Sequence, residues 1–482
     1  MTEPARAGRT RPPSGDNRDT PPKWRAAALA ILGGGAGLGL LVGHRRIGRV
    51  VPILTAGFAL GAAIPVAAAS RRPPITPGDA ARALAAAARP PTFTILVGAR
   101  DEAGVVAQLV ADVSRQDYRD TEDKPLFELI VVDDRSIDGT GRIVSETARD
   151  CGIGDVTRVF RREGAGLADG KGAALTAAPP DVCRGEIALV LDADARIKPQ
   201  FLRHAAGYFA AGAQAVTARR LIQGSRDSQL AGAQADEQTL DGELNRGRWA
   251  LGGCSEFRGN GIMVRCDLLA AAGGWRAEAL TEDIDLSSRI AATSGNSVAW
   301  AIDAEVWEEP VRTLGGLWRQ RLRWAEGAFR RAFEHGPAVV RSPELSLGAK
   351  LDFVAYVGQL AVPAIVLGAT ASAAVTGRRR GLFTILAGYL GVSIVLGWDS
   401  LRWEQRPDGG PLQEPERVGR ALRVAFFNGL WLVVVPKALL DLALRRGPIR
   451  YSKMEHLGAA SPDRLSGSAR LTPGKSEISG DL

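Results

Sequence analysis

The stretch "EIALVLDADARI" (residues 186–197) runs from apolar, strand-forming side chains into two carboxylates, Asp192 and Asp194. A short uninterrupted apolar run of this kind predicts a strand buried on both faces of a sheet. Carboxylates placed close together in a protein are costly unless a cation joins them, because like charges repel and resist ionisation. Almost no basic side chain lies nearby in the sequence, so we expect the compensating cation to arrive with the substrate.

Two earlier segments share this pattern of an apolar run that ends in acidic residues. They are "TFTILVGARDE" (92–102) and "FELIVVDDRSIDGTGRIVSETARD" (127–150), and each continues into a helical pattern. Short strands that alternate with helices are typical of an α/β domain with a largely parallel sheet. The sequence therefore predicts that fold class for the middle of the chain.

Acidic side chains at several strand ends indicate a shared binding site. In open parallel sheets, ligands bind beyond the carboxyl ends of the strands. Any one strand-end aspartate is also a common helix cap or turn former, so the argument depends on their recurrence on three strands. The residues expected to converge are Glu102, Asp133, Asp134, Asp192 and Asp194.

The residue types favour a hard divalent cation at this site. Mg²⁺ and Mn²⁺ prefer oxygen ligands and are commonly held by one or two carboxylates together with substrate phosphates. The four histidines form no metal-binding pair, so zinc is poorly supported. A diphosphate leaving group suits such an ion, because the metal neutralises the charge that develops as the bond breaks.

Long apolar segments flank the soluble middle of the chain. Residues 25–70 predict two transmembrane helices, although the first could instead be a signal peptide, and residues 350–445 contain three further apolar stretches. Basic residues before the first segment and at Arg71 and Arg72 place both flanks, and with them the soluble domain, on the cytoplasmic face of the cell membrane. Residues 1–24 and 457–482 have the composition of disordered segments.

The topology implied by these segments contains one conflict. Three spans after the soluble domain would carry the C-terminus outside, whereas the basic "RRGPIRYSK" (445–453) prefers the inside. Either one stretch lies in the interface or one span is divided, and Gly358 and Pro363 make Leu351–Val375 the candidate. The net charge of +8 would also suit nucleic acid, but the arginines gather near apolar segments, so we expect a membrane and no nucleic-acid partner.

Five motifs together resemble a known family. In chain order they are "VDDRSIDGT" (132–140), "DGKGAAL" (169–175), "LDADA" (191–195), "TEDIDLS" (281–287) and "QRLRW" (320–324). This set is similar to the membrane-bound family 2 glycosyltransferases, which include cellulose, chitin, hyaluronan and poly-N-acetylglucosamine synthases. The resemblance covers roughly residues 92–335. It implies a GT-A fold over residues 90–312 and a nucleotide-sugar donor.

The resemblance also implies roles for individual residues. Glu102 and Asp134, with Asp133 alongside, match positions that hold the uracil and ribose of a UDP-sugar, and Lys171 matches a basic residue of that site. Asp192 matches the carboxylate close to the nucleotide and metal, and Asp194 matches the metal ligand. Asp283, with Glu282 beside it, matches the catalytic base. Gln320, Arg323 and Trp324 match the Gln-any-any-Arg-Trp element.

The segment around Asp283 and the helix that follows it also have simpler interpretations. "EDIDLSSRI" could be only the acidic first turn of a helix, which the helix dipole favours. Residues 313–345 predict an amphipathic, cationic helix in the membrane interface, with arginines toward headgroups or a bound phosphate. That helix could serve as a plain anchor, although an anchor does not explain the Gln-any-any-Arg-Trp match. Trp324, Phe257 and Asn260 are the candidates for the acceptor side.

Several functions remain open at this point. The favoured one is inverting transfer of a sugar to a polysaccharide or a membrane lipid: "QRLRW" favours a processive polymer synthase, and the small number of later spans favours a single transfer. A catalytically silent, nucleotide-binding membrane sensor or scaffold is the alternative. The sugar, the linkage and any partner subunit are not specified by the sequence.

Overall fold

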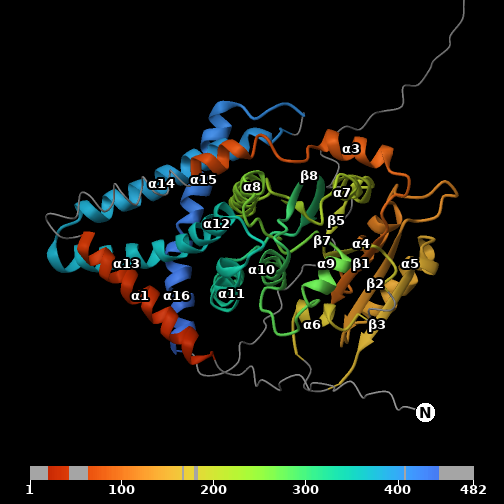
Figure 1. Cartoon of the computed structure of the whole chain (residues 1–482), viewed down its shortest axis with the longest axis horizontal. Coiled ribbons are helices and arrows are strands. Elements are labelled where there is room, and N and C mark those ends of the chain that lie inside the picture. Colours follow the sequence, from red (N-terminus) through yellow and green to blue (C-terminus); the bar gives the residue numbers. More distant parts are fainter. Residues whose placement is uncertain (1–19, 43–62, 165–167, 179–182, 407–408, 445–482) are drawn as a thin grey trace, which may run out of the picture.

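The computed structural model describes residues 20–42, 63–164, 168–178, 183–406 and 409–444. In Figure 1 an α/β domain occupies the right-hand side, and the apolar helices of both ends of the chain lie together on the left. Segments far apart in the sequence thus form one helical unit beside the α/β domain. The expected disordered residues 457–482, and residues 1–19 of the expected leader, lie outside the described ranges.

The α/β domain is built on an eight-stranded sheet in the order β3-β2-β1-β4-β7-β6-β8-β5. β1 pairs in parallel with both β2 and β4, and β2 pairs in parallel with β3. The strands are β1 (Phe93–Ala99), β2 (Phe127–Asp134), β3 (Thr157–Arg162), β4 (Ile187–Asp192), β5 (Arg196–Ile197), β6 (Ala215–Ile222), β7 (Ile262–Arg265) and β8 (Ala299–Glu308). The strand order reverses at β1, so the crevice between β1 and β4 is the position where open sheets bind ligands.

The sheet is more mixed than the sequence predicts. β7 runs antiparallel to its neighbours β4 and β6, whereas β6 and β8 are parallel. β7 is only four residues long and follows a loop with two glycines, so it carries little periodic signal. The expectation of a largely parallel sheet is therefore correct for β3, β2, β1 and β4 and wrong for β7 and for β5, which pairs antiparallel with β8.

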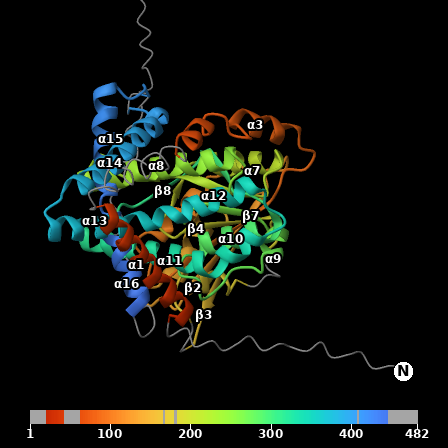
Figure 2. The same ribbon diagram turned by 60° about the vertical axis from the view of Figure 1, so that its left-hand side comes forward.

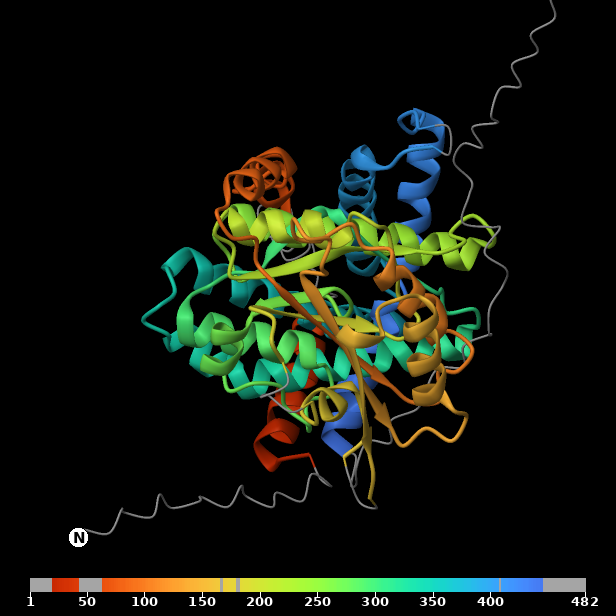
Figure 3. The ribbon, with the colours of Figure 1, turned by 90° about the vertical axis from the view of Figure 1, so that its right-hand side faces the viewer.

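Both faces of the sheet are covered, which explains the continuous apolar runs of the central strands. Leu129 and Val131 of β2 pack into one core, and Ile130 between them packs into the other. Figure 3 shows helices on both sides of the strands. The helices of the domain are α3 (Pro77–Ala86), α4 (Val106–Ser114), α5 (Thr140–Asp150), α6 (Lys171–Leu175), α7 (Phe201–Ala210), α8 (Gln229–Ala250), α9 (Cys266–Ala271), α10 (Glu282–Ser294) and α11 (Leu314–Arg341).

Four helical segments of the described chain are long and apolar enough to cross a membrane: Pro22–Val42, Leu347–Thr376, Arg380–Trp403 and Glu414–Leu444. They comprise α1 (Pro22–Val42), α12 (Leu347–Gly358), α13 (Val362–Thr376), α14 (Arg380–Ser400), α15 (Glu414–Asn428) and α16 (Trp431–Leu444). The first begins at Pro22, inside the leader expected over residues 1–24. Of the second expected N-terminal span, residues 50–62 lie outside the described ranges and residues 63–69 are helical.

The apolar helices pack closely through small residues. α1 lies against α13 and α16, as Figure 2 also shows. A side chain at Gly39 would collide with the backbone of Ile365 and Gly368, so only glycine permits this approach. The contact joins the N-terminal and C-terminal apolar segments into one bundle.

The stretch named as the candidate for an interfacial or divided span, Leu351–Val375, contains a break in its α-helix. A short 3-10 turn, Gln359–Ala361, separates α12 from α13. Phe353 and Ala349 of α12 pack with Cys254 and Val339 of the α/β domain, so α12 belongs to the junction between the two units. A divided span is one of the two arrangements that would reconcile the number of apolar stretches with a cytoplasmic C-terminus.

Candidate active site

One cavity of about 2060 Å³ lies beyond the carboxyl ends of β1, β2 and β4 and extends toward the apolar helices. Small-ligand pockets usually occupy about 300–1,000 Å³, so this cavity is larger than a single small substrate requires. Most of the side chains expected from the sequence line it. They are Glu102, Asp134, Lys171, Asp192, Asp194, Glu282, Asp283, Gln320, Arg323 and Trp324.

Hydrogen bonds join the segments that follow β1 and β2. The backbone N–H of Glu102 donates to Thr140 Oγ1 at 2.8 Å, and the N–H of Ile137 donates to Asp101 Oδ1 at 2.8 Å. Asp101 and Arg135, one after each strand, adopt positive φ angles of 53° and 60°. Non-glycine residues in this region carry strain and are common at binding sites.

The two aspartates at the end of β2 have different environments. Asp134 lines the cavity and pairs with Arg135 and Arg162, each at 2.9 Å. Asp133 is not among the lining residues. It accepts from the backbone N–H of Ser136 at 2.9 Å and pairs with Arg161 at 3.1 Å. Asp133 therefore stabilises the turn after β2, which is the structural alternative for a strand-end aspartate.

Asp192 has a positively charged partner within the protein, Lys171, whereas the sequence predicts that its compensating cation arrives with the substrate. Lys171 Nζ lies 2.6 Å from Asp192 Oδ1 and 3.5 Å from Glu282 Oε1, and it donates to the carbonyl of Gly259 at 2.7 Å. Burial opposes the ammonium form, but the carboxylates of Asp192 and Glu282 outweigh it and raise the pKa of Lys171. One lysine thus joins the "DGKGAAL", "LDADA" and "TEDIDLS" motifs.

Glu282 and Asp283 occupy the first turn of α10, at the wall of the same cavity. Burial raises the pKa of both carboxyl groups, and the positive charge of Lys171 opposes this in each case. A buried carboxylate with a raised pKa accepts a proton more readily than an ordinary aspartate does. Asp283 is therefore suited to act as a general base.

α11 brings the Gln-any-any-Arg-Trp residues to this wall. Gly327 of α11 lies directly against Thr281, where a side chain would collide, so the helix crosses the start of α10 closely. Gln320, Arg323 and Trp324, one to two turns earlier, face the cavity. The ring of Trp324 lies 5.7 Å from the guanidinium carbon of Arg220 and 4.2 Å from that of Arg321.

Two arginines of α11 differ from the expectation that the arginines of this helix face headgroups or a bound phosphate. The side chain of Arg321 is 2% exposed and pairs with Glu237, and that of Arg331 is 3% exposed and pairs with Glu256 at 2.6 Å. Both point into the protein, because Glu237 lies on α8 and Glu256 lies in the loop before β7. α11 is a structural element of the active-site wall.

The expected acceptor residues Phe257 and Asn260 are completely buried and do not line the cavity. Phe257 packs in the core, and its N–H donates to Ser287 Oγ at 2.8 Å. The amide oxygen of Asn260 accepts from the backbone N–H of Asp192 at 3.1 Å. Asn260 therefore positions the backbone at the end of β4 and does not reach the cavity.

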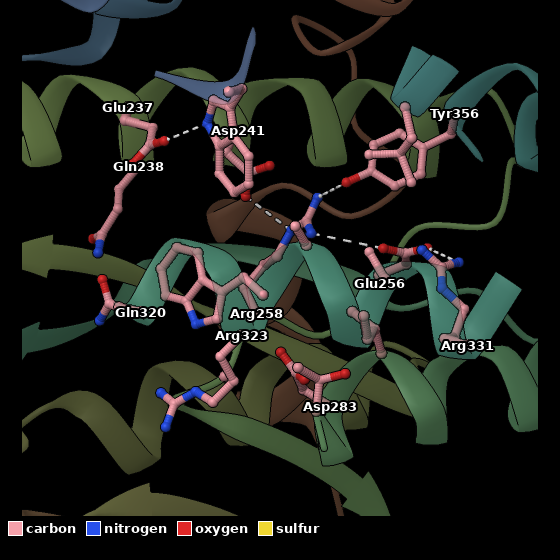
Figure 4. A pocket seen from close by; sticks show the side chains of 18 of the residues that line it. Glu237, Gln238, Asp241, Glu256, Arg258, Asp283, Gln320, Arg323, Arg331 and Tyr356 are labelled. Carbon is pink, nitrogen blue, oxygen red and sulfur yellow. Dashed lines mark hydrogen bonds and ion pairs between the residues drawn. The ribbon is translucent and has the colours of Figure 1, made fainter. Parts of the chain in front are cut away.

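The residue between them, Arg258, does line the cavity and belongs to a network that the sequence motifs do not reveal. Arg258 pairs with Asp241 at 2.9 Å and donates to Tyr356 Oη at 2.9 Å. Figure 4 shows Asp241 and Tyr356 on one side of Arg258 and Asp283 and Arg323 on the other. The partners come from α8, α12 and the loop before β7, so no local pattern could have predicted the network.

A divalent cation fits the carboxylates that end β4. Asp192 and Asp194 both line the cavity and offer only oxygen ligands, the donor chemistry that Mg²⁺ and Mn²⁺ prefer. A second acidic group, Asp285, Glu334 and His335, has ligand atoms within 4.8 Å of one another. Arg276 pairs with Asp285 at 3.3 Å and with Glu334 at 2.7 Å, and none of the three residues of this group lines the cavity.

Comparison with known proteins agrees with this geometry. A family model described as "Glycosyltransferase like family 2" matches residues 90–327. A β-monoglucosyldiacylglycerol synthase from Synechocystis sp. is 30% identical over 405 residues, which cover 82% of this chain and 79% of that protein. The corresponding synthase from Nostoc sp. is 34% identical over 257 residues, and the match spans about half the length of each protein, 52% in both cases.

A solved structure shows the same fold. The mannosyltransferase PcManGT from Pyrobaculum calidifontis, in complex with GDP-Man and Mn²⁺, superposes with a TM-score of 0.51 at 19% identity, covering 86% of this chain and 99% of that one. The strand-end site, the family match and the relatives together establish that the chain belongs to the family 2 glycosyltransferases, with a GT-A domain.

Proposed function

We propose that the protein transfers a sugar from a UDP-sugar to a membrane-lipid acceptor, with inversion at the anomeric carbon. The observation that carries this proposal is that the strand-end carboxylates, Asp283 and side chains of the apolar helices all line the same cavity. Such a cavity can hold a polar donor and an apolar acceptor at once. The lipid-glycosylating names of the Synechocystis and Nostoc relatives support a lipid over a polysaccharide.

The donor half of the cavity has the groups that a nucleotide diphosphate requires. Glu102, which follows β1, and Asp134, which ends β2, line the cavity and would hold the nucleoside. Asp194, with Asp192, would hold Mg²⁺ or Mn²⁺, which supplies charge neutralisation for the diphosphate when bound. Arg323 lines the same half and supports the leaving group electrostatically.

The proton of the reaction would pass to Asp283. A hydroxyl of the acceptor attacks the anomeric carbon from the face opposite the diphosphate and must lose its proton as the new bond forms. A carboxylate within hydrogen-bond reach typically contributes about 10²–10⁴-fold by accepting such a proton. Burial, which raises the pKa of Asp283, suits it to this step.

The site also has a defined relation to the membrane under this proposal. The apolar helices would anchor the chain as a multi-pass protein of the cell membrane, and the basic residues around α1 and at Arg71 and Arg72 would keep the GT-A domain on the cytoplasmic side. UDP-sugars would then reach the cavity from the cytoplasm, and the lipid would reach it from the bilayer.

A donor and acceptor screen tests the proposal. The full-length protein in phosphatidylcholine vesicles with diacylglycerol receives UDP-glucose, UDP-galactose or UDP-N-acetylglucosamine with Mn²⁺ or Mg²⁺, and mass spectrometry identifies the glycolipids. We expect one added sugar with at least one donor, and loss of the product in Asp283→Asn. Glu278→Gln is the matched control, because Glu278 is a carboxylate at the same cavity that pairs only with Arg276 among the ion pairs described. A ladder of products would favour a polymer synthase, and no turnover with any donor would favour the silent nucleotide-binding alternative.

A further inference from the structure

We propose that the part of the cavity between α12, α13, α14 and α16 holds the hydrocarbon tail of an uncharged lipid alcohol, whose hydroxyl reaches Asp283 past Arg258. This inference rests on the function proposed above and specifies its acceptor. It predicts both where the tail lies and which headgroup charge the site accepts.

The membrane-side lining of the cavity is apolar and comes from four helices. It includes Leu351 and Ala355 of α12, Ile365 of α13, Val392 and Leu396 of α14, and Val435 of α16. These residues border the same cavity as Asp283, so a molecule bound among them is continuous with the reacting centre. Apolar surface removed from water at such a site stabilises a bound alkyl chain by about 0.8 kcal/mol per methylene.

The junction between the two halves lies at Arg258 and Gly259. A side chain at Gly259 would lie 3.8 Å from the carboxylate of Asp283, so the backbone here borders the base directly. On the other side, Arg258 contacts Tyr356 of α12 at 2.9 Å. An acceptor with its tail beside α12 would therefore present its polar end at Asp283.

The charges at this junction balance, which favours a neutral headgroup. Three arginines that line the cavity each pair with a carboxylate, and the side chains of two of them are only 3% exposed. The pairs are Arg248 with Asp352 at 3.0 Å, Arg258 with Asp241 at 2.9 Å, and Arg331 with Glu256 at 2.6 Å. A phosphate headgroup would have to compete with these carboxylates for its cations, whereas a hydroxyl needs no counter-charge.

The test fills the apolar half without touching the donor half. Val392→Trp narrows the cavity, whereas Leu390→Trp, two residues away on the same helix at a position that is 38% exposed and does not line the cavity, is the control. Each variant receives UDP-glucose with dioleoylglycerol or with the short-chain dihexanoylglycerol, and kcat/KM is compared. Leu396→Trp repeats the test, and melting temperature and gel-filtration profile confirm that each variant is folded.

We expect Val392→Trp to lower kcat/KM for dioleoylglycerol by about tenfold or more, the loss that corresponds to two methylenes kept out of an apolar site. Its activity with dihexanoylglycerol, and both activities of Leu390→Trp, should stay close to those of the unmodified protein. Equal losses for the long and the short acceptor in both folded cavity variants would overturn the tail assignment.

The headgroup is tested with dihexanoyl phosphatidic acid in place of dihexanoylglycerol. We expect transfer to the alcohol alone, and comparable transfer to the phosphate would overturn the assignment of a neutral headgroup. Failure of the unmodified protein with every acceptor would instead refute the proposed function itself, so the two failures are distinguishable.

Discussion

Removing the charge of Arg331 should destabilise the junction between the GT-A domain and the apolar helices. The guanidinium of Arg331 lies 2.6 Å from Glu256 Oε1, and both side chains are 3% exposed. Arg331→Met keeps most of the side-chain volume but leaves Glu256 buried without its nearest cation. Breaking a buried ion pair from one side costs about 3–5 kcal/mol. Arg258 remains 3.6 Å from the other oxygen of Glu256, so we expect the lower end, about 3 kcal/mol.

The effect is measurable as a melting temperature in detergent, followed by tryptophan fluorescence. At about 2–4 °C per kcal/mol for a domain of this size, Arg331→Met should melt about 6–12 °C below the unmodified protein. The double variant Arg331→Met, Glu256→Gln should recover most of the loss, because it buries no unpaired charge. The deficit of the single variant should also shrink as the pH falls, since protonation removes the charge of Glu256.

Two results would refute this reasoning. One is a single variant that melts within about 2 °C of the unmodified protein, which would place the pair in the weak range of solvent-screened ion pairs. The other is a double variant that is no more stable than the single one. Either result would mean that Glu256 is not held as a buried anion by Arg331.

Further predictions concern the donor half. Lys171→Met should move the acid limb of the kcat profile to higher pH. The positive charge of Lys171 lowers the pKa of Asp283, which burial raises, and a base loses activity as the pH falls through its pKa. Measuring kcat across pH checks this prediction. Asn260→Leu should weaken Mn²⁺-dependent UDP binding in calorimetry, because the N–H of Asp192 loses its acceptor. Gly172→Ala should weaken the same binding, since its new methyl group would lie 2.5 Å from the carbonyl oxygen of Arg276 and displace the start of α6.

The sequence predicts much of the donor half and little of the acceptor half. Strand-end carboxylates such as Asp134, Asp192 and Asp194 follow buried strands, and strand periodicity together with the topology of parallel sheets brings them to one edge. Asp133 also ends the buried strand β2, so the sequence pattern does not distinguish it from Asp134. Only the turn geometry after β2 shows that the two side chains have different roles.

Local sequence patterns do not predict the remaining residues of the site. Arg258 and Tyr356 are 98 residues apart in the sequence, and they meet, together with Asp241, only because α12 returns to the GT-A domain. Arg321 and Arg331 of α11 are buried, and helical spacing does not distinguish them from Arg323, which lines the cavity. Their burial depends on how α11 packs against α10 and α16, which helical periodicity alone does not specify.

The anomeric configuration of the product tests the central mechanism most directly. A single base, Asp283, acting in one displacement step must invert the anomeric carbon, so a donor with an α-linked sugar must yield a β-glycolipid. Proton NMR of the glycolipid formed from UDP-glucose, which carries the α anomer, measures this through the coupling of the anomeric proton. The proposed mechanism predicts a β product, and an α product would contradict it.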